Sequence, residues 1–306
     1  MGQEARIQQS VNSIRARRSS LDALSRQLRT PSILASFDKW QHTSWCISVA
    51  GDSLVRLRLF TEQNFNIVET IGVVAVARYT FEVSVWLRLF ALDGRYGLVY
   101  FDQLLATQQR FYEDTLAQLQ REVAWLRSLG QKEGGAHQKV LRDFGPTAAN
   151  AGETQKLVSA LSSISAEIDA EAGRRFSMYA EAARINGYDF QAYLVETKAI
   201  PPVRQALADI AAERDRFDSR VAHEIKALRP DRWQWRQMAQ KVGRADEYDY
   251  LYSFASKLLH ATPASITTDQ KNLELQEMEL FLKYIDVTIG DVLALAGDYR
   301  PGAAAG

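Results

Sequence analysis

The residues best suited to chemistry lie on one predicted helix near the C-terminal end of the chain. This helix carries a column of aromatic and polar residues at intervals of four: Tyr248, Tyr252, Ser256 and His260. A spacing of four places side chains above one another on one helix face. Histidine has the side chain whose unperturbed pKa lies nearest physiological pH. His260 is therefore the candidate acid or base, and Tyr252 or Ser256 could hydrogen-bond its imidazole or a phosphate oxygen.

A second pair of candidates lies in the most apolar segment of the chain, 65–92. Arg78 and Glu82 are four residues apart in this segment, so a helix carries both on one face. Charges in an apolar helix need partners, because desolvating an unpaired ion is costly. One interpretation is that the two residues pair with each other or with a neighbouring helix and fix its register. The other is that Arg78 and Glu82 converge with Ser256 and His260 in one polar site.

The elements that must position these residues are predicted to be helices throughout. Apolar residues recur at helical spacing, and alternating β-branched segments joined by tight turns are nearly absent. We expect an all-α multi-helix bundle, with an N-terminal helical extension over 1–64, a main bundle over 65–298 and a disordered tail over 299–306. The glycine-containing segment 131–154 is predicted to be a loop-like break. The predicted core centres on Val73, Val74, Val76, Phe81, Val85, Leu89, Leu251, Phe254, Leu258, Leu280 and Ile285.

Composition limits the classes of partner. Lysine plus arginine equals aspartate plus glutamate, at 37 each, so no net charge steers the protein toward nucleic acid or a membrane. Cys46 is the single cysteine, which excludes an internal disulfide and a cysteine-cluster zinc site and favours the reducing cytoplasm. The most apolar window, 67–92, holds several charges that are costly inside a bilayer, so we interpret it as a buried helix and expect no membrane association.

Several chemistries lack their motifs. The chain has no phosphate-binding Gly-x4-Gly-Lys-Ser/Thr loop, no Gly-x-Gly-x2-Gly turn and no His-Glu-x2-His. Its four histidines are widely separated in the sequence. We therefore predict no cofactor and no metal.

A basic stretch, 214–244, is a second candidate for nucleic-acid binding. Basic residues outnumber acidic ones there and alternate with tryptophans. Such a pattern can bind single-stranded nucleic acid through base stacking and phosphate contacts, with Arg232, Trp235 and Arg236 as the candidate residues. The alternative is an exposed helix face laced with ion pairs, with Trp233 in the core.

The spacing of these motifs resembles that of a known family. The relevant positions are Arg78-x3-Glu82 on an apolar helix, followed by Trp233, Val242-Gly243, Tyr248, Tyr252, Ser256-x3-His260 and Pro263. This pattern resembles the bacterial family catalogued as domain of unknown function 5677, over roughly Val68 to Leu293. The resemblance implies an all-helical fold in which the arginine, glutamate, serine and histidine belong together.

The helical build is also similar to that of the HEPN superfamily, whose members are often RNA-cleaving proteins of toxin and antiviral systems. Their usual signature is Arg-x4–6-His on one helix, and its local match here is Arg216-x6-His223. Phe217 follows this arginine, where the family commonly has a polar residue. Carried over to the candidate site, the resemblance instead places the arginine at Arg78 and the histidine at His260, on separate helices.

The resemblance implies a metal-independent ribonuclease, or a nucleic-acid-acting effector of bacterial defence or toxin type. Metal-free RNA cleavage needs a base for the 2′-hydroxyl and a cation for the developing phosphorane charge. His260 and Arg78 supply these two groups, and Glu82 orients Arg78. The alternative is a non-enzymatic helical module that binds a partner protein or ligand through the same groove. We also expect a homodimer, because the long amphipathic helices near each terminus carry apolar stripes that one bundle cannot cover.

Overall fold

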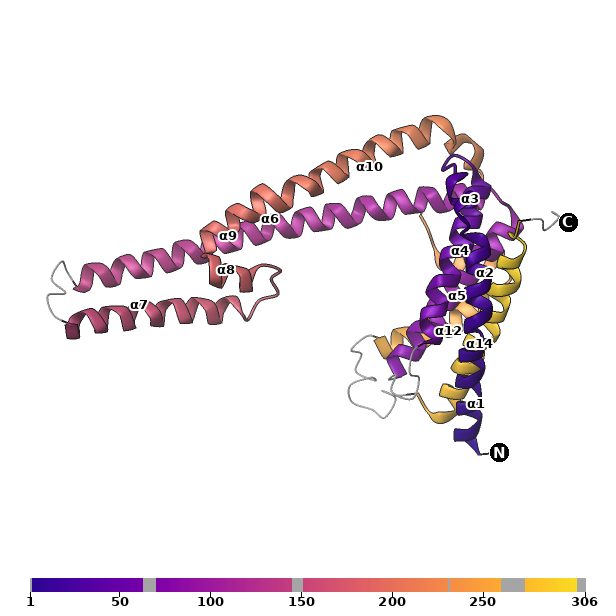
Figure 1. The fold of residues 1–306 in the computed structure, drawn as a ribbon, viewed down its shortest axis with the longest axis horizontal. Coiled ribbons are helices and arrows are strands. Elements are labelled where there is room, and N and C mark those ends of the chain that lie inside the picture. Colours follow the sequence, from indigo (N-terminus) through magenta and orange to yellow (C-terminus); the bar gives the residue numbers. More distant parts are fainter. Residues whose placement is uncertain (1, 63–69, 145–150, 231, 260–272, 302–306) are drawn as a thin grey trace. The chain divides into compact units, whose positions relative to one another are not determined.

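The computed structural model describes residues 2–62, 70–144, 151–230, 232–259 and 273–301 (Figure 1). Every regular element in these ranges is helical, which confirms the predicted all-α fold. None of these helices combines the length and apolarity needed to span a bilayer. The chain divides into two compact units. We call residues 1–103 with 217–306 unit 1, and residues 104–216 unit 2.

Unit 1 is built around α5 (Thr70–Leu92). The last helix, α14 (Leu275–Gly297), makes the most extensive packing with α5, and α12 (Ala245–Leu259) and α11 (Trp235–Lys241) also pack on it. The helices of the N-terminal extension belong to the same unit, because α1 packs on α14, and α4 packs on α2, α5 and α14. The bounds of the remaining elements of unit 1 are α1 Gln3–Ala16, α2 Arg18–Leu28, α3 Pro31–Ala35, α4 His42–Thr61 and a 3-10 turn at Ala222–Ile225.

The sequence of α5 explains its central place. Its buried side chains lie on most of its circumference rather than on a single stripe, as expected for a helix covered on several sides. Two small polar residues, Thr80 and Ser84, are also buried. The Thr80 hydroxyl donates to the carbonyl of Val76 one turn earlier, at 2.5 Å, so its polar group is satisfied inside the helix itself.

Most of the predicted core is buried in unit 1. The buried members are Val73, Val74, Val76, Phe81, Val85, Leu89, Leu251 and Ile285. Phe254 is half-buried, and the side chain of Leu258 lies outside the described residues. The prediction for Leu280 is wrong, because its side chain is 49% exposed. Leu280 precedes Phe281 and Leu282, and three consecutive helical residues span too wide an arc for all of them to face one core.

Unit 2 has an apolar core of its own, a division that the predicted single bundle over 65–298 does not include. This core joins one face of α6 to the end of α7 and to the short helices that follow it. Its members are Leu119, Val123, Leu126, Leu129, Ile168, Ala172, Ala183, Tyr188, Ala192, Val195 and Ile200. The helices are α6 Tyr96–Phe144, α7 Ala151–Ala172, α8 Ala180–Asn186, α9 Tyr188–Leu194 and α10 Ile200–Arg220, and the unit boundaries fall within α6 and α10.

Two backbone features shape the short helices of unit 2. Gly187 has a φ of +87° and turns the chain between α8 and α9, a conformation that favours glycine. A π-helical turn, Val195–Ala199, joins α9 to α10 directly before Pro201 and Pro202. Proline lacks the amide hydrogen that would bond one turn back, and its ring clashes with that carbonyl, so a widened turn suits this position.

The predicted loop-like break at 131–154 is wrong over most of its length. Helix α6 continues through Gln131 to Phe144, and α7 begins at Ala151. Gly134 and Gly135 lie within α6, and a Cβ added at either would meet nothing within 4 Å. Two glycines weaken a helix without ending it when its flanking turns are well formed. Of the predicted tail, residues 302–306 lie outside the described residues, and Tyr299 and Arg300 close turns at the end of α14.

Gly97 marks a close approach within unit 1. A Cβ at this position would collide with the backbone carbonyl of His42 and come within 3.1 Å of the Cys46 sulfur. Cys46 is 1% exposed and donates to the carbonyl of Gly94 at 3.4 Å. Burial raises the pKa of the Cys46 thiol to about 12. The start of α6 can therefore pack against α4 only because residue 97 has no side chain.

The two kinds of glycine should respond oppositely to alanine. We expect Gly134→Ala with Gly135→Ala to raise the free energy of unfolding by about 1–2 kcal/mol in total, because alanine lowers the backbone entropy cost of helix formation. Gly97→Ala, the control, should lower stability because its Cβ collides with backbone. Urea unfolding followed by circular dichroism measures both effects. A loss of stability in the Gly134/Gly135 double variant would contradict the helical assignment of this segment.

Candidate functional site

Arg78 and Glu82 form an ion pair on α5. The Nε of Arg78 donates to Oε1 of Glu82 at 3.0 Å, as their spacing of four residues allows. The two side chains are 38% and 23% exposed, so the pair lies at the edge of the bundle rather than in its centre. Both charges are therefore compensated locally, while the guanidinium remains accessible from solvent.

Helix α12 supplies the aromatic part of the site. The Tyr252 hydroxyl donates to the same Glu82 oxygen at 2.5 Å, and its ring lies 4.3 Å from the guanidinium carbon of Arg78. Tyr248, one turn earlier, stacks on Tyr252 with ring centroids 4.0 Å apart. Tyr252 thus contacts both members of the ion pair, through a hydrogen bond and a cation–π contact. We call Arg78, Glu82, Tyr252 and Tyr248 the arginine clamp.

Arg78 and the two tyrosines of the clamp keep their charge states across the physiological pH range. Burial works to lower the pKa of Arg78, but its interactions with Glu82 and Tyr252 outweigh it and hold this pKa above its ordinary value. Burial, together with the hydrogen bond to Glu82 and its charge, raises the pKa of Tyr252. Burial also raises the pKa of Tyr248. The arginine therefore stays charged, and both tyrosines remain neutral phenols at neutral pH.

This arrangement can bind an anion, and its arginine and two tyrosines do not take up a proton at neutral pH. The guanidinium is held at Nε, which leaves its outer edge outside the ion pair with Glu82. Glu82 is occupied by Arg78 and Tyr252. Within the described ranges, no group of three or more His, Cys, Asp or Glu side chains could hold a metal ion. The side chain of Ser256 and the whole of His260 lie outside the described residues, so their convergence with Arg78 stays a prediction.

The three nucleic-acid candidates lie in or just before α11, in different environments. Arg232 is exposed. Trp235 is half-buried and meets Trp233 edge-on, with ring centroids 5.4 Å apart, and Trp233 in turn stacks on Trp86 at 4.3 Å. Arg236 makes two hydrogen bonds of 2.8 Å to Asp249, which lower the pKa of that carboxyl group. Both tryptophans therefore pack together, and one of the two arginines already has an acidic partner.

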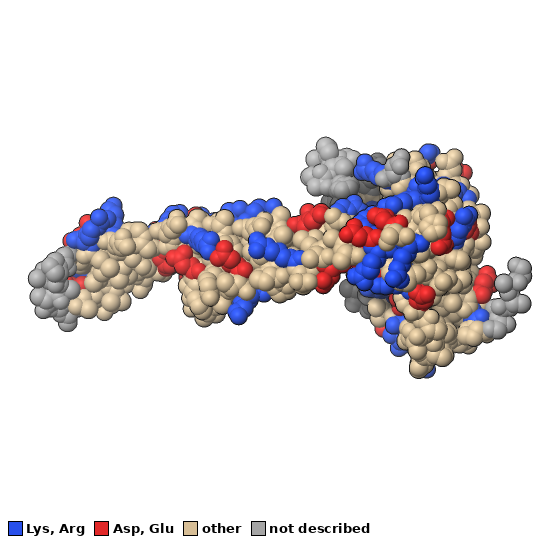
Figure 2. All heavy atoms as spheres, turned by 90° about the horizontal axis from the view of Figure 1, so that it is seen from above, with Lys and Arg blue, Asp and Glu red and all other residues tan. Residues whose placement is uncertain are grey.

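The wider charge distribution matches the balanced composition. On the face drawn in Figure 2, basic and acidic side chains are interspersed. The local arginine–histidine match is likewise exposed: Arg216 pairs with Glu213 at 3.4 Å, and His223 lies in the 3-10 turn of unit 1. Phe217, directly after Arg216, is fully buried. Arg216 and His223 are therefore both exposed to solvent, and Phe217 between them in the sequence belongs to the core.

A second charged network was missed by the sequence reasoning. Asp291 on α14 accepts from Arg88 on α5 at 2.7 Å and from Arg244 at 3.0 Å. Arg244 also pairs with Glu247 of α12, whose other oxygen accepts from Tyr284 at 3.1 Å. The signal in the sequence was an acid within an apolar stretch of α14, which favours a cationic partner. The network ties together the three helices that form the centre of unit 1.

The bond between Tyr252 and Glu82 can be tested through stability. We expect Tyr252→Phe to lower the free energy of unfolding at pH 7 by about 1 kcal/mol, because it removes a hydrogen bond to a charged acceptor. The folded-state pKa of Tyr252 is raised. Its contribution is therefore fully present below the pKa of a free tyrosine, about 10, and is lost as the pH rises toward the folded-state pKa. The difference between wild type and variant should thus narrow above pH 10.

Urea unfolding at several pH values measures this difference. Tyr250→Phe, on the same helix, is the matched control because Tyr250 is 44% exposed and its ring contacts do not involve the hydroxyl. Equal stability losses in the two variants would show that the Tyr252 hydroxyl contributes nothing specific.

Comparison with known proteins gives one family. The chain matches the model of a family of unknown function, DUF5677, over residues 70–277. This range contains both Arg78 and Glu82 of α5, Tyr252 of α12 and the whole of unit 2. No curated protein and no solved structure matches the chain. Because the family model covers about two-thirds of the residues, the chain belongs to the DUF5677 family.

Proposed function

We propose that this protein acts on RNA as a metal-independent ribonuclease, or a related nucleic-acid-acting effector, of bacterial defence or toxin type. In this proposal Arg78 binds the phosphate and His260 serves as acid or base. The observation that supports it is the arginine clamp, in which an accessible guanidinium is bonded to Glu82 at 3.0 Å and stacked on Tyr252 at 4.3 Å. A cation held in this way is suited to a developing negative charge.

The clamp favours an oxyanion over other ligands. A guanidinium offers a planar fork of donors that matches phosphate geometry, and it binds best when its position is fixed in advance. Glu82 holds the Nε end, and the Tyr252 ring lies against the face. The outer edge can then meet a phosphate with little further loss of side-chain freedom. The side chain is 38% exposed, so a phosphate can reach it from solvent.

The proposed chemistry divides two tasks between two residues. Arg78 stabilises the charge that develops on the phosphorane, and it stays protonated throughout. The proton of the attacking 2′-hydroxyl needs an acceptor, which neither the charged Arg78 nor the neutral tyrosines of the clamp provide. His260 follows α12 directly in the sequence and supplies an imidazole of the required type. Ser256 is the additional hydroxyl that orients this imidazole.

The test is RNA cleavage in excess chelator by wild type and by variants that unfold at the wild-type temperature. We expect His260→Ala and Arg78→Ala each to reduce the cleavage rate at least a hundredfold, because general acid–base catalysis and charge stabilisation each contribute about that much. Arg78→Lys should restore little, because lysine lacks the planar fork. The readout is the rate of loss of a defined single-stranded RNA.

Arg216→Ala and His223→Ala are the matched controls, since they remove the local arginine–histidine match from an exposed surface. Both should cleave at the wild-type rate. If only these two variants lost cleavage, the catalytic residues would be Arg216 and His223 and not those of the clamp. The same background rate in every variant would exclude the ribonuclease.

A non-enzymatic helical module that binds a partner protein or ligand is the other candidate, and a homodimer is the form of it that an observation favours. It is favoured by large apolar side chains that unit 2 leaves in solvent on α8 and α9: Ile185 is 82% exposed, and Phe190 and Tyr193 are each 54% exposed. Exposed apolar surface of this kind marks interaction sites on soluble proteins. A homodimer whose interface covers these side chains would remove their apolar surface from water.

Light scattering at micromolar concentrations tests this candidate. Wild type should have twice the chain mass, and Ile185→Glu should have the mass of one chain. Ser159→Glu, on the exposed surface of α7, is the control and should leave the dimer intact. One chain mass for the wild type across this range would dismiss the homodimer.

A further inference from the structure

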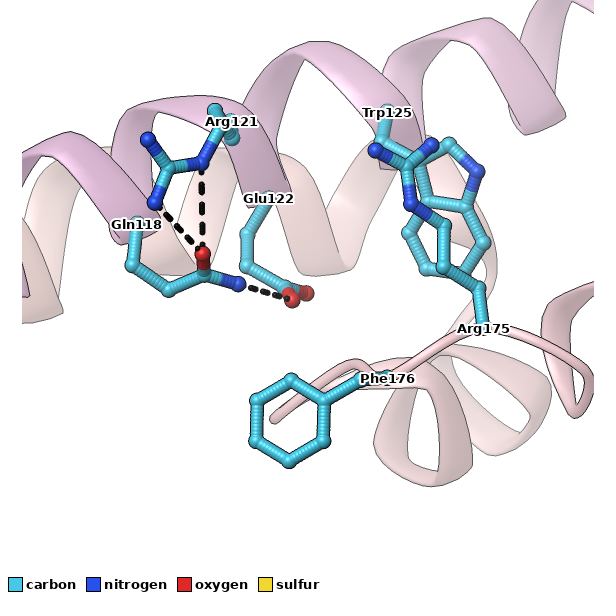
Figure 3. Close-up of a pocket in the computed structure, with 6 residues that line it drawn as sticks. All are labelled: Gln118, Arg121, Glu122, Trp125, Arg175 and Phe176. Carbon is cyan, nitrogen blue, oxygen red and sulfur yellow. Dashed lines mark hydrogen bonds between the residues drawn. The ribbon is translucent and has the colours of Figure 1, made fainter. Parts of the chain in front are cut away.

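Unit 2 contains a cavity of about 250 Å³ between α6 and the segment that joins α7 to α8 (Figure 3). Six residues line it: Gln118, Arg121, Glu122, Trp125, Arg175 and Phe176. They combine a carboxylate, two aromatic rings and two guanidinium groups. Neither the arginine clamp nor the proposed cleavage uses any of them.

Glu122 is a buried carboxylate without a cationic partner among the described residues. Glu122 as a whole residue is only 3% exposed. One oxygen accepts from the Ser177 hydroxyl at 2.7 Å. The other accepts from the backbone amide of Met178 at 3.3 Å and from the side-chain amide of Gln118 at 3.2 Å. An ionised carboxylate has about four acceptor positions, so these neutral donors leave capacity for a further donor.

Two aromatic rings flank this carboxylate. Trp125 is half-buried and presents one face to the guanidinium of Arg175, whose central carbon lies 5.2 Å from the ring centroid. Phe176 follows Arg175 directly and is 85% exposed. In Figure 3 the Phe176 ring and the Trp125 ring lie on opposite sides of the Glu122 carboxylate. The cavity therefore offers flat apolar surfaces beside an acceptor that only a hydrogen-bond donor can satisfy.

The two arginines provide positive charge at the rim. Arg121 donates to the Gln118 side-chain oxygen at 2.9 and 3.2 Å, and Arg175 lies over Trp125. Both are exposed, and neither forms an ion pair with a described residue. Such guanidinium groups can bind a phosphate without first breaking an ion pair.

We propose that this cavity binds a guanine nucleotide, either free or as an unpaired guanosine of single-stranded RNA. A carboxylate can only accept, so it selects a base edge with adjacent donors. Guanine presents two neighbouring donors on its Watson–Crick edge, its ring N–H and its exocyclic amino group. Adenine, cytosine and uracil each place an acceptor beside their donor, and the carboxylate repels that acceptor. Among the four bases, guanine is therefore the one that complements Glu122.

The volume of the cavity and the long hydrogen bond from Gln118 to Glu122 both fit a guanine base. A cavity of about 250 Å³ is smaller than the range usual for drug-sized ligands, so it suits a base with the sugar and phosphate left outside at the rim. The hydrogen bond from Gln118 to Glu122, at 3.2 Å, is at the long end of its range. Guanine can displace the Gln118 amide and so use a second acceptor position of the Glu122 carboxylate. Arg121 still donates to the Gln118 oxygen after this exchange. Phe176 then covers the base, and Arg175 moves from Trp125 to the phosphate.

This inference is independent of the proposed cleavage, because a nucleotide pocket is useful with or without catalysis at the clamp. The test is titration calorimetry of the full chain with GMP, AMP, CMP and UMP. A second arm measures fluorescence anisotropy of labelled pentanucleotides that have guanosine, adenosine or uridine at the centre of a uridine run. GMP or the guanosine oligonucleotide should bind about tenfold more tightly than its counterparts, as expected for one paired hydrogen-bond contact.

Two variants test the assigned residues. Glu122→Gln keeps the shape of the side chain and should abolish the preference for guanine. Phe176→Ala should weaken binding about tenfold for every base, since stacking does not depend on base identity. Phe111→Ala is the matched control, because Phe111 is also on the surface of unit 2 and is 63% exposed. Thermal unfolding of each variant separates loss of binding from loss of the fold.

The two arms also distinguish the source of the base. Tight binding of GMP assigns the cavity to free nucleotide, and tight binding of the guanosine oligonucleotide alone assigns it to RNA. Both arms measure binding and not cleavage, so failure of the proposed cleavage leaves this result unchanged. The proposal is overturned by equal affinity for the four bases, by absence of binding in both arms, or by unchanged binding in folded Glu122→Gln or Phe176→Ala.

Discussion

The arrangement of unit 1 depends on the pairing of two arginines carried by an otherwise apolar helix. Helix α5 is buried around most of its circumference, so its charges need partners on α5 itself or on the helices that cover it. Arg78 lies against Tyr252 of α12, and Arg88 binds Asp291 of α14 at 2.7 Å. Apolar side chains alone tolerate several registers, whereas a hydrogen bond between charged groups forms only within a narrow range of distances and angles. The two arginines thereby link α5 to α12 and to α14 at defined positions.

The arginine clamp of unit 1 and Glu122 of unit 2 differ in how their charges are compensated. In the arginine clamp, an acid, a cation and a phenol satisfy one another, and the accessible part is the outer edge of the guanidinium. Glu122 of unit 2 is more deeply buried and is bonded only to neutral donors. The clamp thus retains a capacity to bind negative charge, whereas the Glu122 carboxylate retains a capacity to accept hydrogen bonds. A chain whose overall charge is zero can in this way carry local sites of opposite preference.

Helical spacing was sufficient to predict the all-α fold, the buried α5 and the pairing of residues four apart. It also selected the column that contains Tyr252, although the helix opposite this column could not be deduced from spacing alone. Two predictions failed where composition was used without context. Gly134 and Gly135 lie inside α6 because its flanking turns sustain the helix, and Leu280 is exposed because Phe281 and Leu282 already occupy the inward positions.

Glu122 could not be identified from sequence, since its partners Ser177 and Met178 are neutral and lie more than fifty residues away. The contribution of Ser256 and His260 stays a prediction, because the Ser256 side chain and His260 lie outside the described residues.

The environment of Cys46 has a practical consequence for studying this chain in solution. Its sulfur is covered by the start of α6, and burial raises the pKa of its thiol to about 12. Maleimide and iodoacetamide reagents attack the thiolate, which is scarce at neutral pH when the pKa is so high. The folded protein therefore behaves toward these reagents as though it had no cysteine. A single cysteine introduced on the surface of either unit can carry a fluorophore or spin label selectively, with the native residue left in place.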